Sequence, residues 1–282
     1  MSFTPGVHPT ARVHASASID PTALIEAEVS IGRDVIVGPA CVIGTGTRLR
    51  DRAIIVEHTV MGRNNDVHPY AVLGGDPQDL AFKGDPRGDV IIGDGNVFRE
   101  GATVNRATQN GGPTRIGSNC FLMTCAHIGH NAQIGDRVIM ANGASLAGHS
   151  RVGSRSVMSA HCAVHQFTHV GEGVMFQANA SVSMHVPPYV LLATENTVVG
   201  LNVVGLKRHA EFDDEDRREI KEAFRAVYRR ALGQPFSDVV NDLTGREWKP
   251  GARRFVDFVV DALNQTPPRD RGLCGSVRRA RS

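Results

Sequence analysis

The chain has 282 residues, enough for one large folded domain or two smaller ones, and 30 of them are glycine while only 5% are aromatic. A formal net charge of +2 leaves no basic stripe of the kind that binds nucleic-acid phosphates, so nucleic acid is not an expected partner. The sequence contains neither an apolar run of about 18 residues nor an apolar signal segment, which predicts a cytoplasmic protein without an integral membrane segment.

From Val7 onward an apolar residue recurs at every sixth position. A period of six is neither helical nor a simple strand alternation, and it is typical of hexapeptide-repeat parallel β-helices, in which each hexad supplies a short strand and a corner. Three hexads close a triangular coil, so residues 18 apart stack at the inter-strand spacing of about 4.8 Å. The 27 hexads predict about nine coils over residues 1–186. The series is Val7, Val13, Ile19, Ile25, Ile31, Val37, Ile43, Leu49, Ile55, Met61, Val67, Leu73, then Ile92, Phe98, Val104, then Ile116, Leu122, Ile128, Ile134, Met140, Leu146, Val152, Met158, Val164, Val170, Phe176, Val182.

Two insertions interrupt the repeat, near residues 74–91 and 105–115. The step from Leu73 to Ile92 is 19 residues, and the step from Val104 to Ile116 is 12. Because Leu73 and Val104 end consecutive coils, both insertions are expected to leave the same edge of the prism. Long loops on a rigid scaffold often carry function, so this edge is where we expect a site.

The repeat stops at Val186, because the two prolines that follow cannot continue a strand ladder. A small α-helical domain is expected over residues 187–265. Its first helix should begin at the acidic cluster Asp213–Asp216 and end at Gly233. Two amphipathic stretches follow, at Phe236–Leu243 and Phe255–Leu263, and residues 266–282 are expected to form a disordered, basic tail.

Counting by 18 also aligns polar residues. Ile128 and Leu146 share one face of successive coils, so His130 and Gly148, two residues further on, are stacked, and Gln166 continues their column. The surrounding polar residues are Asn131 and His149 in the next column, His165 beside Gln166, and Gln78 and Asp79 on the first loop.

This geometry suits acyl transfer. A neutral imidazole can take a proton from an attacking hydroxyl group, and the N–H of a glycine one coil away can bind the developing oxyanion. Three other interpretations remain open: outward histidines that only decorate a sheet, an inactive β-helix that binds a nucleotide sugar or assembles partners, and a zinc hydratase with His127, His149 and His165 as ligands. The zinc site is disfavoured because these histidines occupy different offsets in the hexad.

The chain resembles the UDP-N-acetylglucosamine (UDP-GlcNAc) O-acyltransferases that begin lipid A biosynthesis. Together the motifs that carry the resemblance are specific, and they span almost the whole chain: VHPTA at Val7–Ala11, GDPQDLAFKG at Gly75–Gly84, LMTCAHIGHN at Leu122–Asn131, ASLAGH at Ala144–His149, AVHQF at Ala163–Phe167, VPPYV at Val186–Val190 and GLNVVGLKR at Gly200–Arg208.

The resemblance implies a left-handed β-helix, a homotrimer with active sites between subunits, an acyl carrier protein as thioester donor and no cofactor. It implies that His130 is the base for the sugar 3-hydroxyl group and that Gly148 supplies the oxyanion-binding amide. The other implied roles are contacts to glucosamine for Gln78 and Asp79, pocket positions for His127, His149, His165 and Gln166, nucleotide and donor contacts for Asn202 and Arg208, and an acyl-length ruler at Ala178.

Several residues depart from the family pattern. Asn131 replaces the usual Asp after the base, and a neutral amide stabilises an imidazolium less than a carboxylate does. Ala81 replaces a Lys, Val204 replaces a Glu, and NRAT at Asn105–Thr108 replaces HRGT. These changes leave the reaction class standing, but they leave open the acyl length and a paralogue that acylates a different nucleotide sugar, at oxygen or at nitrogen.

Overall fold

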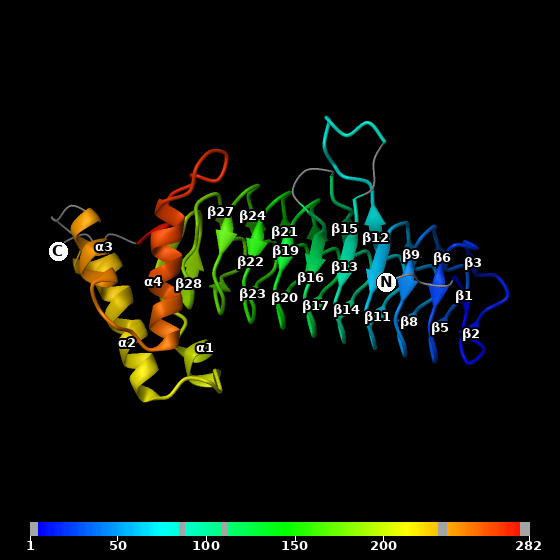
Figure 1. The fold of residues 1–282 in the computed structure, drawn as a ribbon, viewed down its shortest axis with the longest axis horizontal. Coiled ribbons are helices and arrows are strands. Elements are labelled where there is room, and N and C mark those ends of the chain that lie inside the picture. Colours follow the sequence, from blue (N-terminus) through cyan, green and yellow to red (C-terminus); the bar gives the residue numbers. More distant parts are fainter. Residues whose placement is uncertain (1–4, 85–87, 109–111, 231–235, 277–282) are drawn as a thin grey trace.

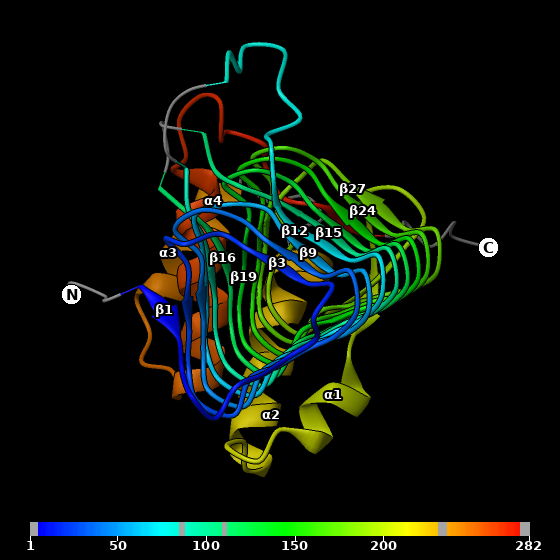
Figure 2. The ribbon, with the colours of Figure 1, turned by 90° about the vertical axis from the view of Figure 1, so that its right-hand side faces the viewer.

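The computed structural model describes residues 5–84, 88–108, 112–230 and 236–276. Three parallel sheets form the faces of a triangular prism, visible end-on in Figure 2, and a helical region closes its C-terminal end in Figure 1. The predicted left-handed parallel β-helix is confirmed, and the nine strands in each of two sheets correspond to the nine expected coils.

The strands are mostly two residues long and lie in the following order. The first sheet contains β1 (Gly6–Val7), β4 (Leu24–Ile25), β7 (Val42–Ile43), β10 (Thr59–Met61), β13 (Val90–Ile92), β16 (Thr114–Ile116), β19 (Gln133–Ile134), β22 (Arg151–Val152) and β25 (His169–Val170). The second contains β2 (Arg12–Val13), β5 (Ser30–Ile31), β8 (Arg48–Leu49), β11 (Asp66–Val67), β14 (Val97–Phe98), β17 (Phe121–Leu122), β20 (Ile139–Met140), β23 (Val157–Met158), β26 (Met175–Phe176), β28 (Val190–Ala193), β29 (Thr197–Leu201) and β30 (Gly275–Ser276). The third contains β3 (Ser18–Ile19), β6 (Ile36–Val37), β9 (Ile54–Ile55), β12 (Val72–Gly75), β15 (Thr103–Asn105), β18 (His127–Ile128), β21 (Ser145–Leu146), β24 (Ala163–Val164) and β27 (Ser181–Val182).

The apolar residue of each hexad points into the prism. Ile128 pairs with Leu146, which pairs with Val164, and none of the three is more than 2% exposed. Burial of this continuous aliphatic column is the main stabilising contribution to the β-helix, because each coil covers the apolar face of the next.

Both insertions leave the third sheet, and the inward apolar residues stay paired although the register of β12 against β15 shifts between Leu73 and Gly75. Leu73 on β12 still pairs with Val104 on β15, and Val104 pairs with Ile128 on β18. β12 ends at Gly75 and β13 begins at Val90, and β15 ends at Asn105 and β16 begins at Thr114, so these strands extend into the predicted insertions. The first loop projects from the prism above β12 (Figure 1), so the two loops share one edge as expected.

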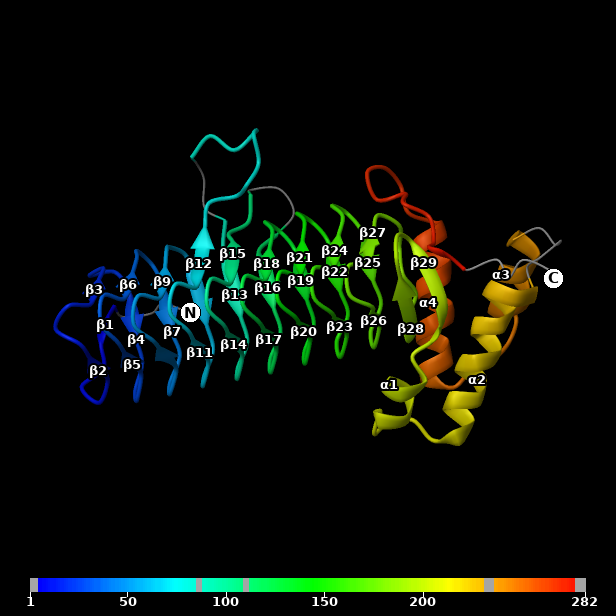
Figure 3. The same ribbon diagram turned by 180° about the vertical axis from the view of Figure 1, so that it is seen from behind.

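The C-terminal region begins with two strands rather than a helix. β28 continues the second sheet parallel to β26, and β29 then reverses direction against β28. The helices follow as α1 (Val203–Arg208), α2 (Asp214–Arg225), the π-helical turn η1 (Ala226–Arg230), α3 (Phe236–Thr244) and α4 (Pro250–Leu263), arranged as in Figure 3.

The start of the predicted first helix is correct, because Asp213 and Asp216 form a reciprocal capping box at the start of α2. Ile220 and Phe224 are buried on its inner face. The α-helical geometry ends at Arg225, and the predicted end at Gly233 lies outside the described residues.

Residues 266–276, expected to be disordered, instead fold back onto the β-helix. His185 donates its backbone N–H to Gly272 O and accepts that of Cys274, at 2.7 and 2.8 Å, and β30 pairs with β29. Backbone pairing of this kind does not depend on amino-acid composition, so the Pro- and Arg-rich sequence of this segment gave no indication of the pairing. Residues 277–282 lie outside the described part of the chain.

Within the described residues, no helix is both long and apolar enough to cross a membrane.

Candidate active site

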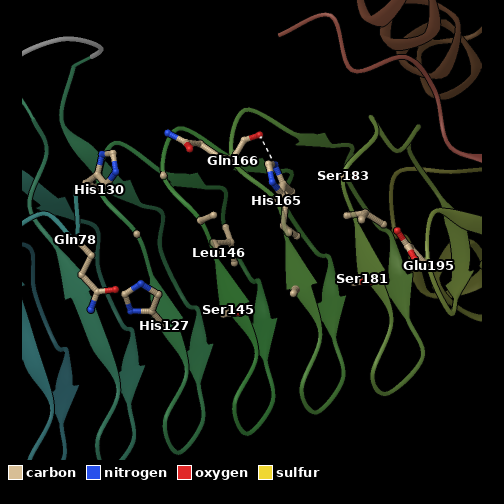
Figure 4. A pocket seen from close by; sticks show the side chains of 16 residues that line it. Gln78, His127, His130, Ser145, Leu146, His165, Gln166, Ser181, Ser183 and Glu195 are labelled. Atoms are coloured by element: carbon tan, nitrogen blue, oxygen red, sulfur yellow. Dashed lines mark hydrogen bonds between the residues drawn. The ribbon is translucent and has the colours of Figure 1, made fainter. Parts of the chain in front are cut away.

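The outer face of the third sheet carries a groove of about 530 Å³. Its floor follows the outward residues of four neighbouring strands, His127, Ser145, Ala163 and Ser181, which are paired in register. Three inter-strand steps make this floor about 14 Å long. Figure 4 shows His130 and Gln78 at one end of the groove and Glu195 at the other.

His130 is held by a network that fixes the roles of its two ring nitrogens. The residue is only 6% exposed, and Nδ1 lies 2.9 Å from Asn131 Oδ1. The Asn131 amide is itself oriented by its partners: Nδ2 donates to the carbonyl oxygens of Thr108 and Gly112, and Oδ1 accepts from the Thr108 N–H and Oγ1–H groups. An amide oxygen can only accept, so His130 Nδ1 carries the proton and Nε2 holds the free electron pair.

That electron pair faces Gly148. A Cβ atom at position 148 would lie 2.5 Å from His130 Nε2, closer than any real contact, so only glycine leaves room for the imidazole. The Gly148 N–H has no hydrogen-bond partner among the described residues, although the residue is buried. A buried, unpaired N–H group beside a base is the arrangement that an oxyanion requires.

Two further imidazoles surround His130. The ring of His149 meets that of His130 edge to face at a centroid distance of 5.2 Å, and His127 Nδ1 lies 2.8 Å from Thr103 Oγ1. Burial lowers the pKa of both His127 and His149, and the neighbouring His130 lowers both further. These two groups therefore favour the neutral state.

The first loop supplies the residues predicted for it. Gln78 lines the groove near His127, and Asp79 is close enough to His149 to favour the protonated form of that imidazole. His165 and Gln166 line the groove two coils further along the β-helix, where His165 Nδ1 lies 3.1 Å from Gln166 O.

Three predicted residues lie apart from both the groove and His130, whereas three others, Asp79, Asn131 and His149, lie near His130 or near each other without lining the groove. Asn202 caps α1, since its Oδ1 accepts from the Gly205 N–H and its Nδ2 donates to Gly173 O, both at 2.9 Å. Arg208 is exposed at the end of α1, which lies on the side of the prism opposite the first loop (Figure 2). Ala178 is exposed at the corner that follows β26 and does not line the groove.

The zinc alternative finds no ligand set in the described residues. No group of three or more His, Cys, Asp or Glu side chains is arranged there to hold a metal ion, and His127, His149 and His165 do not form one. His127 and His165 both line the groove but lie two coils apart, and His149 occupies a different offset in the hexad.

Sequence reasoning missed several groove residues. Counting by 18 from His127, which precedes the inward residue Ile128, leads to Ser145 and Ser181. This column of outward residues would have identified both serines. Glu195 lies beyond the repeat, between β28 and β29, so counting by 18 gives no signal for it. Thr108 belongs to a loop, whose course the repeat does not determine.

Comparisons with known proteins agree with this geometry. A family model described as UDP-N-acetylglucosamine O-acyltransferase, domain 2, matches residues 185–274, and a model of six bacterial transferase hexapeptide repeats matches residues 113–148.

Two relatives and one solved structure extend the match. An acyl-[acyl-carrier-protein]–UDP-N-acetylglucosamine O-acyltransferase of Syntrophobacter fumaroxidans is 43% identical over 197 residues, covering 69% of this chain and 76% of the relative. One of the same description from Anaeromyxobacter sp. is 39% identical over 177 residues, covering 62% and 68%. The crystal structure of the UDP-N-acetylglucosamine acyltransferase of Francisella novicida superimposes with a TM-score of 0.80 at 32% identity, covering 97% of this chain and 95% of that one. The chain therefore belongs to the UDP-N-acetylglucosamine O-acyltransferase family.

Proposed function

We propose that this protein transfers an acyl group from an acyl carrier protein thioester to the 3-hydroxyl group of UDP-GlcNAc, the reaction with which lipid A biosynthesis begins. The observation that carries the proposal is the fixed His130 imidazole, with its free Nε2 beside the unpaired Gly148 N–H in a groove of an acyltransferase of this family. The proposal includes a cytoplasmic location.

In this mechanism Nε2 of His130 removes the proton as the sugar oxygen attacks the thioester carbonyl carbon. A C–O bond forms, and the negative charge moves to the carbonyl oxygen, where the Gly148 N–H stabilises it. The C–S bond then breaks, and the imidazolium returns the proton to the departing thiolate. Asn131 holds Nδ1–H throughout, and His127 and His149 favour neutrality so that the charge stays at His130.

The groove beyond His130 supports an acyl chain as the transferred group. Its floor carries the small side chains of Ser145, Ala163 and Ser181. The floor extends along the β-helix to Glu195, so an extended chain has a continuous surface to lie on. Ala178 remains a candidate for limiting chain length only if a neighbouring subunit's groove meets it.

A homotrimer is part of the proposal. The helix α1, which ends at Arg208, and the first loop lie on opposite sides of one chain (Figure 2), so a site that uses both needs residues from two chains. Leu80, in that loop, is 99% exposed in the isolated chain, as expected of an apolar residue that contacts a neighbour. The exposed Lys207 and Arg208 would then offer a basic surface to an acidic carrier protein.

The activity is tested by incubating the purified protein with acyl carrier thioesters of several chain lengths and either UDP-GlcNAc or its 3-amino analogue. Mass spectrometry should show acylated UDP-GlcNAc. Acylation of the amino sugar alone would instead identify a paralogue that forms an amide, and binding without turnover of any donor would contradict the acyltransferase assignment.

Shared sites are tested by subunit complementation. His130→Ala and Arg208→Ala chains, each inactive alone, should regain part of the activity when co-expressed, because some interfaces then combine an intact His130 with an intact Arg208. Absence of any recovery in mixed trimers would place both residues in one chain's site or remove Arg208 from it. Light scattering gives the assembly state directly.

A further inference from the structure

The tetrapeptide Asn105–Thr108, where NRAT replaces the family's HRGT, runs from the end of β15 into the second loop and contacts the start of the first loop. Asn105 ends β15 and pairs with Gly75 at the end of β12. Thr108 is the residue that orients the Asn131 amide. One short backbone segment therefore connects the start of the first loop to the support of His130.

Arg106 is the charged residue of this tetrapeptide, and it is buried. Its side chain is only 6% exposed, and Nη2 lies 2.9 Å from both Glu57 Oε1 and Asp76 Oδ1. Nε donates to the same Asp76 oxygen at 3.1 Å, and the guanidinium lies 5.1 Å from the ring centroid of Phe82. The Arg106 backbone N–H also donates to Gly75 O at 2.8 Å.

These contacts tie the loop down at several points. Asp76 is the first residue after β12, and its carbonyl oxygen accepts from Asn105 Nδ2 at 2.6 Å. Phe82 lies further along the loop, beneath the same guanidinium. At the returning end, a Cβ atom on Gly88 would lie 1.4 Å from Ala107 O, so the loop comes back directly against the tetrapeptide.

Gln78 and Asp79 are therefore two and three residues from an anchored position. The side chains outside this anchor have little support of their own: Gln78 and Leu80 are exposed, and Asp79 makes a local hydrogen bond to the Ala81 N–H at 2.9 Å. The conformation of such a loop depends on the contacts at its two ends, because backbone entropy otherwise favours many conformations.

We propose that Arg106 is a positioning residue that holds the first loop over the groove, through Asp76 and Phe82, so that Gln78 and Asp79 meet the acceptor sugar. The inference rests on the proposed function for the identity of that sugar. Arg106 acts on acceptor binding through the loop, and Thr108 in the same segment acts on the base through Asn131.

The experiment compares Arg106→Met with Arg50→Met, a matched control. Arg50 also forms a bidentate ion pair, with Asp66 at 2.8 and 2.7 Å, but on the second sheet away from the groove. Hydrogen exchange of the amides at residues 76–84 is measured on the free proteins, with core amides as an internal reference. KM for UDP-GlcNAc and kcat are measured separately.

In Arg106→Met we expect faster exchange in the loop, unchanged exchange in the core and a KM for UDP-GlcNAc raised about tenfold or more, because a displaced contact residue loses its alignment. Arg106→Lys keeps the positive charge but not the planar, forked guanidinium group, so its KM for UDP-GlcNAc should lie between those of the wild type and Arg106→Met. Arg50→Met should leave the loop amides and KM unchanged. Wild-type loop exchange and KM in Arg106→Met would overturn the proposal.

Asp76→Asn provides a second route if Arg106→Met proves poorly folded. It should also speed hydrogen exchange in the loop and raise KM for UDP-GlcNAc. The double variant should differ little from either single variant, because both substitutions remove the same Arg106–Asp76 interaction. A uniform loss of protection across the core, with Asp76→Asn behaving as wild type, would make Arg106 purely structural and overturn the proposal. Loop exchange needs no substrate, so it decides the matter even if the wild-type protein does not acylate UDP-GlcNAc.

Discussion

The third sheet contains two stretches with the same backbone and different surfaces. In β6 and β9 the inward residues Val37 and Ile55 are fully buried, just as Ile128 and Leu146 are in β18 and β21. The outward residues differ: Ile36 on β6 is 47% exposed and apolar, whereas His127 begins the floor of the groove. The repeat constrains only the inward residues, which build the core. The outward residues can therefore vary and include functional side chains, and the two loops lie where the outward residues change from apolar to polar.

The strongest test of this division removes the proposed base. His130→Ala should lower kcat/KM about a thousandfold, because general-base catalysis contributes on that scale. His161→Ala is the matched control, since this histidine is exposed at a corner of the same repeat and outside the groove. Steady-state kinetics with circular dichroism of both variants checks the result, and comparable losses in the two would contradict the assignment of His130.

Gly148→Ala should cost about a hundredfold in kcat, because the added Cβ atom must displace the His130 imidazole and crowd the N–H group that is proposed to bind the oxyanion. The backbone of Gly148 is not in the left-handed region, so the fold should accept alanine. Gly275→Ala, where no atom lies within 4 Å of the new Cβ, serves as the control. Full activity in Gly148→Ala would remove this residue from the mechanism.

Ser145→Leu should lower kcat/KM about tenfold by filling the floor of the groove, while the melting temperature stays close to that of the wild type because the side chain points outward. Ile54→Leu changes the same outward column on β9, beyond the loops, and should leave both quantities unchanged. Equal effects from the two substitutions would show that the groove is not the functional half of the sheet.

Asn131→Asp is expected to have the smallest effect on rate and a distinct effect on pH dependence. A carboxylate beside Nδ1 stabilises the imidazolium, so the neutral base appears only at higher pH and the acid limb of the kcat/KM profile moves upward. The substitution also removes the Nδ2–H donors to Thr108 O and Gly112 O, so activity at neutral pH should fall a few-fold. An unchanged profile would show that Asn131 does not contact the catalytic imidazole.

The β-helix was predictable because its determinants are local and repeated. Each hexad faces the same environment, so the spacing of Ile128, Leu146 and Val164 fixes both the strands and their register. The same spacing stacked His130 with Gly148, and the structure brings the Nε2 atom of His130 to the position that a Gly148 side chain would occupy.

What the spacing could not reveal depends on irregular backbone. The support of Asn131 by Thr108 and Gly112 arises from the course of a loop, which no periodicity describes. The position of Asn202 as a helix cap depends on how α1 folds after the repeat has ended. Pairing of β30 with β29 uses only backbone groups, so the side chains of residues 275–276 give no indication of it.

The reversal of chain direction between β28 and β29 has a consequence for the protein's length. A stack of identical parallel coils has no internal stop, since its last strands always present unpaired N–H and C=O groups to the next layer. Here β29 turns back against β28, and the helices follow at that end of the prism. The antiparallel pairing of β29 interrupts the parallel template of the second sheet, and β30 pairs with the outer edge of β29, so a second copy cannot extend this sheet as one more parallel coil.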